Sequence, residues 1–361
     1  MKLALLEEFT RLGGGQIVAS KISEIFSDKG EFIDLFTDYS HPFLIGNYNR
    51  IFEQNLKFNE NDNYLKILKN SLMLKRNLKK INGYDFIINN HPTVFIYKGD
   101  LNMMHTLSIL EFAINEEGKV LKKYLTKLIK ISGLYKTYNQ AHFWSPGKYN
   151  MRISKDIFSI LGINSTKFHV IPLSVKFPNF IDFSIKKKNQ VLVFGRINRE
   201  KNLETVIAMA KQCKLNFIIA GALNPGNESY YEMIDSIKPE NVKIIVNPDN
   251  ILKDKLFRES GIFLHVRRRE NFPISLLEAI SYGCIPVVPK YGGTWEDIVL
   301  KGQYGIGYKS VQEGIDSLNE AFNMSNSNIQ EIYESRERFS EDNFSQRFSS
   351  LVNELNENKK R

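Results

Sequence analysis

Apolar runs of strand length alternate with amphipathic stretches of helix length along this chain of 361 residues. This alternation is typical of a parallel β-sheet covered by helices on both faces, so it predicts an α/β fold. The expected strands span residues 2–6, 86–89, 102–104, 190–194, 217–220, 242–246, 262–265 and 286–289, and the expected helices span 15–26, 203–211, 273–281 and 345–356.

The length predicts two domains, because single hydrophobic cores stop growing at about 250 to 300 residues. The stretch 177–189 has no clear periodicity, contains Pro178 and a run of three lysines, and precedes a strongly apolar strand. We therefore expect a linker there, a first domain over 1–180 and a second over 181–340. An amphipathic helical pattern continues through 341–361, and its apolar face needs a partner.

Positive charge is concentrated in the first half of the chain. Residues 1–180 hold 24 Lys+Arg against 16 Asp+Glu, whereas the remainder holds 25 against 24. Much of the excess falls in two helix-like stretches, 66–80 and 119–130, which are either solvated faces or surfaces for anionic lipid headgroups or a phosphorylated acceptor. Nucleic acid is not expected as a partner, because aromatic residues do not interleave with the basic ones.

Two cysteines, Cys213 and Cys284, are too few for a disulfide framework, and no Cys/His cluster has metal-ligand spacing. No bound metal is therefore expected. The first acidic residue follows only four apolar ones, and no apolar run approaches about 18 residues, so neither a secretory signal nor a membrane span is expected. These features favour a cytoplasmic protein that could bind peripherally at the inner face of a membrane.

The densest pattern of polar and apolar residues is the stretch 270–278, which follows an apolar strand. Pro273 suits the first turn of a helix, and Asn271 can cap it. The first N–H groups of that helix would then lie unpaired, namely those of Ile274, Ser275 and Leu276. Such a helix N-terminus is an anion site, and the natural anion is a phosphate.

Two glutamates flank this helix start. Glu278 falls in the second turn among apolar neighbours, where an unpaired carboxylate would cost several kcal/mol, and ribose hydroxyls of a nucleotide would be suitable partners. Glu270, on the preceding loop, would face the opposite end of the ligand. The alternative is a surface glutamate followed by one that merely stabilises the helix.

Three further patterns end expected strands. Gly195 allows a tight turn, and Arg196 and Lys201 follow it, where they could clamp a diphosphate or form a solvated loop. Three glycines at 13–15 permit close approach of a ligand or form a flexible turn. His105 ends a short strand, where a lone histidine is more often structural than catalytic. All these residues lie at carboxyl ends of strands, where open α/β sheets bind ligands.

Together, these residues resemble those of retaining glycosyltransferases of family 4, which have the GT-B fold. The resemblance is strongest over 191–298, and its motifs are Gly195-Arg196 with Lys201-Asn202, the pair Glu270 and Glu278, Gly283-Cys-Ile-Pro286 and Gly292-Gly293-Thr-Trp-Glu296. The first half matches more loosely, through the glycines 13–15, His105 and residues 170–172. Residues 89–91 and 100–105 look like the lipid-linked-glycan branch, such as dolichol-linked mannosyltransferases.

The resemblance implies two Rossmann-like domains that face a central cleft, with the C-terminal helix crossing back to the first domain. It implies a retaining, metal-independent hexosyltransferase without a cofactor. Its substrate would be a UDP- or GDP-linked sugar, held by the second domain. Its acceptor, a glycan or a lipid-linked molecule, would lie on the first domain, as in polysaccharide or glycolipid biosynthesis.

The resemblance also implies roles for individual residues. Arg196 and Lys201 would bind the diphosphate, Glu278 the ribose and Glu270 the transferred sugar, while His105 would lie at the reacting centre. Further contacts to the donor would come from Gly14, Gly15, Gly195, Phe272, Ile274, Ser275 and Leu276.

The sequence departs from the family pattern at two places. Pro273 stands where many members have Gly, and the run of three arginines at 267–269 is unusual. Other classes of function stay open: a sugar-nucleotide epimerase of the same fold, which needs no acceptor, and a non-catalytic protein that binds nucleotide sugars or nucleic acid.

Overall fold

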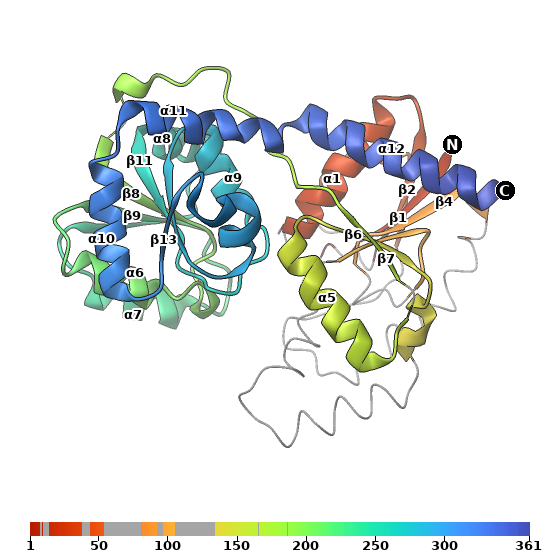
Figure 1. Cartoon of the computed structure of the whole chain (residues 1–361), viewed down its shortest axis with the longest axis horizontal. Helices are drawn as coiled ribbons and strands as arrows, with labels where there is room; N and C mark the ends of the chain where they lie inside the picture. Colours follow the sequence, from red (N-terminus) through yellow and green to blue (C-terminus); the bar gives the residue numbers. More distant parts are fainter. Residues whose placement is uncertain are drawn as a thin grey trace. The chain divides into compact units, whose positions relative to one another are not determined.

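A computed structural model of the chain describes residues 1–7, 9, 14–37, 44–53, 81, 83–91, 97–104, 134–164, 166–185 and 187–361. These residues form two compact units, one made of Met1–Pro172 with Phe344–Arg361 and the other of Leu173–Asn343. Each unit has a parallel sheet covered by helices, so the predicted α/β architecture of two Rossmann-like halves is confirmed (Figure 1).

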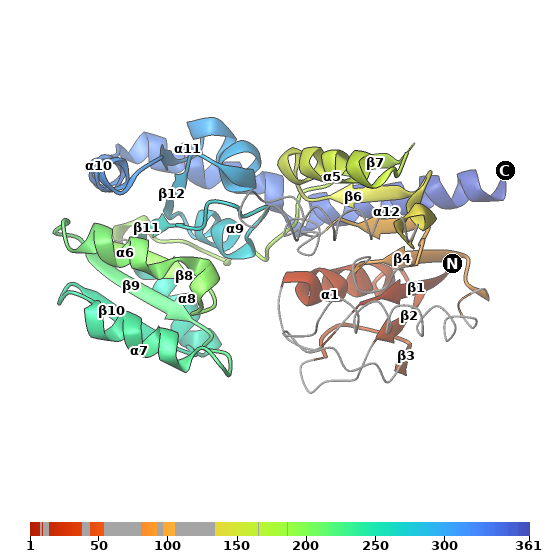
Figure 2. The ribbon, with the colours of Figure 1, turned by 90° about the horizontal axis from the view of Figure 1, so that it is seen from below.

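The first unit is built on a sheet of seven strands. Its elements are β1 (Lys2–Leu6), α1 (Gly14–Ser27), β2 (Phe32–Thr37), β3 (Arg50–Glu53), β4 (Phe86–Asn89), β5 (Leu101–Met103), β6 (His142–Ser145), α5 (Lys148–Leu161), β7 (Lys167–Val170) and α12 (Glu341–Lys360). The strands run parallel in the order β3-β2-β1-β4-β5-β6-β7. Figure 2 shows β4, β1, β2 and β3 side by side in that order.

The C-terminal helix α12 packs on this first unit, beside α1 (Figure 1). The ring centroid of Phe348 lies 5.1 Å from that of Trp144 in β6 and 6.4 Å from that of Phe26 in α1. Near the end of the helix, Lys359 Nζ lies 2.9 Å from Asp100 Oδ2. The apolar face that the sequence left without a partner is thus buried on the first unit.

The second unit is built on a sheet of six strands. Its main elements are η3 (Phe183–Ile185), β8 (Lys187–Phe194), η4 (Arg199–Lys201), α6 (Leu203–Ala210), β9 (Asn216–Gly221), α7 (Glu228–Ile237), β10 (Val242–Val246), α8 (Asn250–Glu259), β11 (Ser260–Leu264), α9 (Ile274–Ser281), β12 (Ile285–Pro289), β13 (Ile306–Tyr308), α10 (Val311–Phe322) and α11 (Asn326–Glu334). The strands run parallel in the order β10-β9-β8-β11-β12-β13.

Both sheets have Rossmann topology. Counted from the first strand of each unit, the order is 3-2-1-4-5-6, with a seventh strand added in the first unit. The order reverses between β1 and β4 in one sheet and between β8 and β11 in the other. Loops diverge at such a reversal, so each unit has a natural ligand site at the carboxyl end of those two strands.

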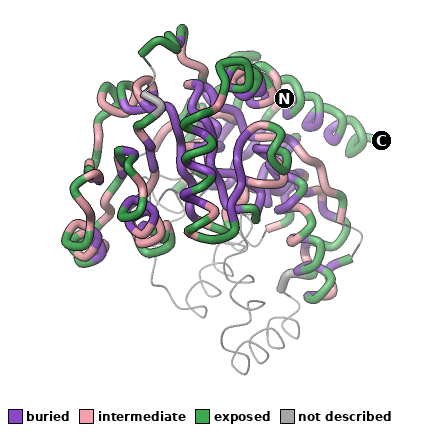
Figure 3. The backbone as a smooth tube through the Cα atoms, turned by 60° about the vertical axis from the view of Figure 1, so that its left-hand side comes forward, coloured by how far each residue is buried: buried purple, intermediate pink, exposed green. Residues whose placement is uncertain are grey.

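Helices cover both faces of the second sheet. Ile262 and Leu264 of β11 belong to a buried cluster that includes side chains of α6, α7, α10 and α11. The intervening Phe263 points to the opposite face, where its ring centroid lies 6.1 Å from that of Phe257 in α8. Figure 3 shows the strands as buried segments between partly exposed helices. The strand ends are therefore the places where a ligand could reach the sheet.

The boundary between the units falls before residue 173, whereas the sequence predicts it after residue 180. The Val175 N–H group donates to the Phe339 carbonyl at 3.0 Å, which joins this segment to the second unit. The first strand of that unit also begins earlier than expected, at Lys187, inside the predicted linker 177–189. Hydrogen bonds between backbone groups do not depend on apolar side chains at regular spacing. The boundary at residue 173 and the early start of β8 therefore cannot be predicted from the periodicity of the sequence.

The two basic stretches, 66–80 and 119–130, lie outside the described residues. Among the helices that are described, none combines the length and the hydrophobicity needed to cross a bilayer.

Candidate functional site

The predicted site residues of the second unit gather where β8 and β11 end, the point at which its strand order reverses. Gly195 and Arg196 directly follow β8. After β11, residues 265–273 lead into α9. Because the strands are parallel neighbours, both loops leave the same edge of the sheet.

Lys201 and Glu270 form an ion pair at this edge, with 2.7 Å between Lys201 Nζ and Glu270 Oε2. Both side chains are mostly buried, at 21% and 17% exposure. Lys201 ends η4, and Asn202, in a left-handed conformation with φ of 51°, joins that turn to α6. The sequence motifs assign both residues to one site, but they do not indicate that the two side chains pair directly.

Glu270 is held in its ionised form. Burial by itself would raise the pKa of this carboxyl, but the positive charges of Lys201 and Arg267 outweigh burial and lower the pKa to about 2. Arg267 Nη1 lies 3.5 Å from Glu270 Oε2 and 3.7 Å from Glu200 Oε2. A carboxylate with two cationic neighbours is therefore fixed at the end of β11.

Two glycines far along the chain shape the Glu270 loop. The Gly293 N–H group donates to the Glu270 carbonyl at 2.9 Å. A Cβ atom on Gly293 would lie 1.8 Å from the Asn271 carbonyl oxygen, and one on Gly292 would lie 2.7 Å from that of Arg268. The glycine pair that the sequence singles out thus lets a second turn pack directly against the loop.

We expect Gly293→Ala to destabilise the second unit by about 1–3 kcal/mol, because the added methyl group overlaps backbone that cannot give way like a flexible side chain. That loss corresponds to a melting temperature lower by roughly 2–12 °C for a unit of this size. Thermal denaturation measures it, with Gly83→Ala as the control, since a Cβ there meets no atom of the described residues within 4 Å. Equal melting temperatures for Gly293→Ala and wild type would contradict this packing.

Helix α9 begins one residue later than predicted. Pro273 occupies the N-cap position with ψ of 120°, so its backbone is extended rather than helical. The Leu276 N–H group donates to the Pro273 carbonyl at 3.1 Å, so it is not unpaired as the sequence suggests. Within the described part of the chain, the N–H groups of Ile274 and Ser275 have no backbone acceptor, and these two are available to an anion.

Two of the predicted donor contacts have buried side chains. Phe272 is 7% exposed and packs with its ring edge-on against Phe339, with 5.9 Å between centroids. Leu276 is fully buried. Their side chains belong to the core, so they hold the loop and helix in place rather than present an open surface.

Glu278 has a protein partner that the sequence does not indicate. Lys253 Nζ, from α8, lies 2.7 Å from Glu278 Oε1 and 5.5 Å from the centroid of the Phe194 ring. Lys253 already compensates the charge of Glu278, so the burial of this carboxylate does not by itself call for a ligand hydroxyl, and its contact with a ribose stays a prediction. A ribose would share the carboxylate with this lysine.

The backbones at the ends of β8 and β9 lie close together, and the absence of a side chain at Gly221 matters more for this than its absence at Gly195. Among the residues that the structure describes, a Cβ on Gly195 would meet only Lys201 Cε, at 3.7 Å, whereas one on Gly221 would lie 1.6 Å from the Gly195 carbonyl oxygen. Arg196 is half-buried and has no ion-pair partner within the described ranges. Its guanidinium group is therefore available to an anionic ligand.

His265 directly follows β11 and is 7% exposed. Burial lowers its pKa to about 4. Nε2 has no hydrogen-bond partner among the residues that the structure describes, and Tyr308 Oη donates to the His265 carbonyl at 2.8 Å. The side chain lines a cavity of about 20 Å³ together with Gly195, Lys201 and Arg267. The site thus contains a neutral imidazole, and the sequence does not predict His265 as a site residue.

A lowered histidine pKa predicts loss of stability in acid. Above the ordinary pKa of about 6.5, His265 is neutral in both folded and unfolded chains. Below it, the unfolded chain binds the proton first, so the free energy of unfolding should fall by about 2–3 kcal/mol between pH 6.5 and 4.5. Chemical denaturation of the wild type and His265→Leu across this range measures the effect. Equal acid sensitivity of the two proteins would contradict it.

At the matching edge of the first sheet, a buried carboxylate joins three segments. Glu7, just after β1, is fully buried and accepts hydrogen bonds from Gln16 of α1, at 3.2 Å, and from Asn90 after β4. His91 Nδ1 lies 3.4 Å from Glu7 Oε1. In the sequence, Glu7 is only a sign against a secretory signal, because a single acidic residue after a strand does not identify a buried carboxylate.

The glycine turn of the first unit is partly described. Gly14 begins α1, and the Gly15 carbonyl accepts from Asn90 Nδ2 at 3.1 Å. His105 and Gly13 lie outside the described residues. Within the described ranges, no group of three or more His, Cys, Asp or Glu side chains could hold a metal ion.

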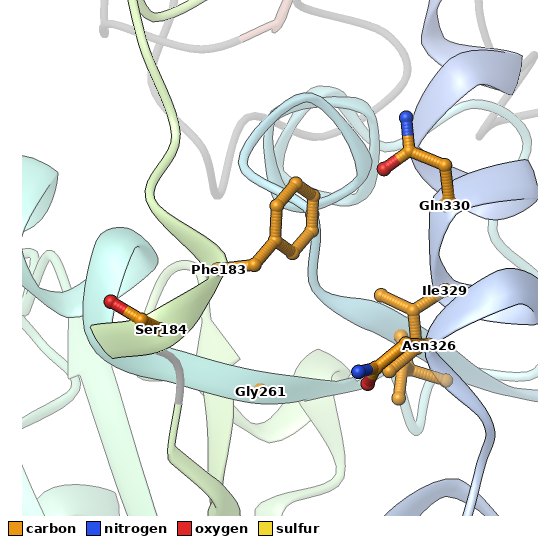
Figure 4. Close-up of a pocket in the computed structure, with 8 residues that line it drawn as sticks. Phe183, Ser184, Gly261, Asn326, Ile329 and Gln330 are labelled. Carbon is orange, nitrogen blue, oxygen red and sulfur yellow. The ribbon is translucent and has the colours of Figure 1, made fainter.

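A larger pocket lies at the opposite edge of the second sheet, where β11 and β12 begin (Figure 4). It has a volume of about 320 Å³, and its described lining includes Phe183, Ile329 and Gln330 but no charged side chain. Such a lining does not suit a diphosphate. The ion pairs at the carboxyl edge therefore mark the candidate site better than pocket size does.

Comparison with known proteins gives matches at the level of the family and of the fold. Residues 178–345 match the family model described as "Glycosyl transferases group 1". The second unit is a group 1 glycosyltransferase domain. This confirms the resemblance at the level of the group, and membership of family 4 stays a prediction.

The chain also matches curated proteins over part of its length. The chain is 25% identical over 165 residues to a glycogen synthase of Clostridium kluyveri, which covers 45% of this chain and 34% of that protein. It is 24% identical over 190 residues to a GDP-Man:Man(3)GlcNAc(2)-PP-Dol alpha-1,2-mannosyltransferase of Dictyostelium discoideum, covering 47% of this chain and 38% of that protein. The chain thus spans less than half the length of these relatives.

Solved structures share the fold over nearly the whole chain. A sucrose-phosphate synthase of Thermosynechococcus elongatus has a TM-score of 0.75 at 14% identity and covers 98% of both chains. HepE of Anabaena, solved in complex with UDP and glucose, has a TM-score of 0.67 at 15% identity and covers 98% of this chain and 100% of its own. Because these matches cover 98% of this chain, they include the first unit, whose Rossmann-like fold is that of the N-terminal half of GT-B enzymes.

Proposed function

We propose that this protein is a retaining glycosyltransferase that moves a hexose from a nucleotide-diphosphate sugar to a glycan or lipid-linked acceptor. The observation that carries the proposal is the Lys201–Glu270 pair at the reversal point of the second sheet. A cation for a diphosphate and a carboxylate for a sugar are the two groups that such a donor needs, and they lie side by side there.

The chemistry of the site suits departure of a diphosphate. The bond between the anomeric carbon and the β-phosphate oxygen breaks, and negative charge grows on the phosphate. Lys201, Arg196 and the free N–H groups at the start of α9 would stabilise that charge, because they are held in place before the reaction. In this account they do the work of a Lewis acid, so we propose a metal-independent reaction.

Glu270 would accept hydrogen bonds from hydroxyl groups of the transferred sugar. Its ionised form also favours the positive charge that develops on the sugar ring as the leaving group departs. The acceptor oxygen would bond to the anomeric carbon from the face that the diphosphate leaves, and its proton would pass to the departing phosphate oxygen. The product would keep the configuration of the donor.

The donor and the acceptor are proposed as classes. HepE binds UDP and glucose by its title, and the Dictyostelium relative uses GDP-mannose by its name, which supports a UDP- or GDP-linked hexose here. The basic excess of residues 1–180 would suit an acceptor on an anionic membrane surface. We therefore propose a cytoplasmic enzyme that binds peripherally at the inner face of a membrane, with His105 near the reacting centre.

A transfer assay tests the proposal. The protein is incubated with isotope-labelled UDP-glucose, UDP-galactose or GDP-mannose and with total lipid extract as the source of acceptors. We expect label in a lipid or glycan product with one donor, and an unchanged anomeric configuration by proton NMR. Inverted product would refute retention. Conversion of the free nucleotide sugar into its epimer without any acceptor would favour an epimerase.

A further inference from the structure

Three consecutive arginines precede Glu270, and the structure gives them different surroundings. Arg267 is 28% exposed and lies between Glu270 and Glu200. Arg268 is exposed and donates through Nη2 to the Lys309 carbonyl at 2.8 Å, away from the carboxylate. Arg269 is exposed as well. Arg267 therefore lies against the site carboxylate, whereas the Arg268 guanidinium is directed to a backbone carbonyl, and a general need for positive surface charge does not explain the position of Arg267.

Lys201 and Arg267 approach the same oxygen of Glu270. Lys201 Nζ lies 2.7 Å and Arg267 Nη1 lies 3.5 Å from Oε2. Within the described part of the chain, Oε1 has no such contact. The shorter contact to Oε2 belongs to the cation that the proposed function assigns to the diphosphate.

In the proposed function, Lys201 would have to contact both Glu270 and the donor diphosphate. If Lys201 turns to a diphosphate, its contact with Glu270 weakens and the buried carboxylate loses its nearest counter-charge. A buried carboxylate without a partner is costly, so it would shift its position or take up a proton. Arg267 is already on the same oxygen, so its guanidinium group would still lie beside the carboxylate as a counter-charge.

We propose that Arg267 is a positioning residue that keeps Glu270 ionised and oriented while Lys201 binds the donor diphosphate. Glu270 Oε1 then stays free for hydroxyl groups of the sugar. The inference rests on the proposed function and deepens it, because it assigns Arg267 to recognition of the sugar rather than of the phosphates. Glu200 is 60% exposed and competes only weakly for the guanidinium group.

Calorimetric titration tests this role on the full chain. UDP, GDP, UDP-glucose and GDP-mannose are titrated into the wild type, Arg267→Ala and Arg267→Lys, with Arg268→Ala as the matched control from the same arginine run. In Arg267→Ala we expect affinity for the nucleotide sugar to fall about tenfold, with affinity for the free nucleotide diphosphate within threefold of wild type. Arg267→Lys should recover part of the loss, and Arg268→Ala should behave as wild type.

Other outcomes overturn the inference in distinct ways. An equal loss of affinity for the free diphosphate and the nucleotide sugar would make Arg267 a phosphate ligand. Unchanged affinities would make it a surface arginine. In Glu270→Gln, adding Arg267→Ala should have no further effect on sugar recognition, and a full second loss would contradict positioning through Glu270. If the wild type binds none of the four ligands, the proposed function itself fails.

Discussion

Glu270→Gln is expected to lower kcat/KM for sugar transfer by at least about 100-fold, the size of effect seen when one preorganised electrostatic group is removed from an active site. Glutamine keeps the shape of the side chain but removes its charge. The positive charge that develops on the sugar then loses its nearest anion, and Lys201 and Arg267 lose the counter-charge that they share. Transfer kinetics with the donor identified by the labelled-sugar assay measure the loss.

The fold should survive this substitution, because Glu270 lies on the loop between β11 and α9 and not in the hydrophobic core. Glu313→Gln is a suitable control, since Glu313 is a surface carboxylate 3.9 Å from Lys290 and far along the chain from the site loops. We expect the control to transfer sugar at the wild-type rate. Wild-type activity of Glu270→Gln would contradict the proposed role of the Glu270 carboxylate in transfer.

Lys201→Ala should produce a second large effect, on both binding and transfer. We expect kcat/KM to fall about 100-fold or more, since the departing diphosphate loses a charge-assisted contact. The ion pair with Lys201 also helps to lower the pKa of Glu270, so the acidic limb of the pH profile should move to higher pH in this variant. Initial rates from pH 4 to pH 8 measure both effects.

The control for this lysine is Lys238→Ala. Lys238 also forms a close ion pair, 2.5 Å from Asp235, but at the end of α7 and not at the site. Its loss should leave the pH profile unchanged. If Lys201→Ala lowers the rate without moving the acidic limb, the two side chains do not act on each other as the structure indicates.

Strands with continuous apolar runs were the part of the fold that sequence could predict. The strand at 2–6, the one at 86–89 and the one at 242–246 match β1, β4 and β10 residue for residue. The sequence did not predict β2, β3, β6, β7 and β13. Among these, β2 interrupts its apolar run with Asp34, whose carboxylate accepts from Tyr84 and Arg50 across the fold. A buried polar residue satisfied by distant partners is invisible to a pattern of apolar residues.

The sequence singles out residues of the candidate site but does not indicate which protein side chains pair with them. Gly195, Lys201, Glu270 and Glu278 were found because they stand next to strand ends or helix starts, where ligands bind. Their partners come from elsewhere: Lys253 stands in the middle of α8. No local sequence rule connects a helix residue to a carboxylate 25 positions away, since only the packing of α8 against α9 brings them together.

Thermal stabilisation by nucleotide sugars tests the central claim most directly, because a ligand that binds only the folded protein raises its melting temperature. The panel is UDP-, GDP- and ADP-sugars without added metal, applied to wild type and Lys201→Ala at the same concentrations. At about 100 times its dissociation constant, a bound donor adds roughly 2.7 kcal/mol to the free energy of unfolding. We predict a clear rise for wild type with one nucleotide and little or none for Lys201→Ala. Equal shifts in the two proteins would place the donor elsewhere, and no shift with any ligand would contradict a donor site at the β8–β11 edge.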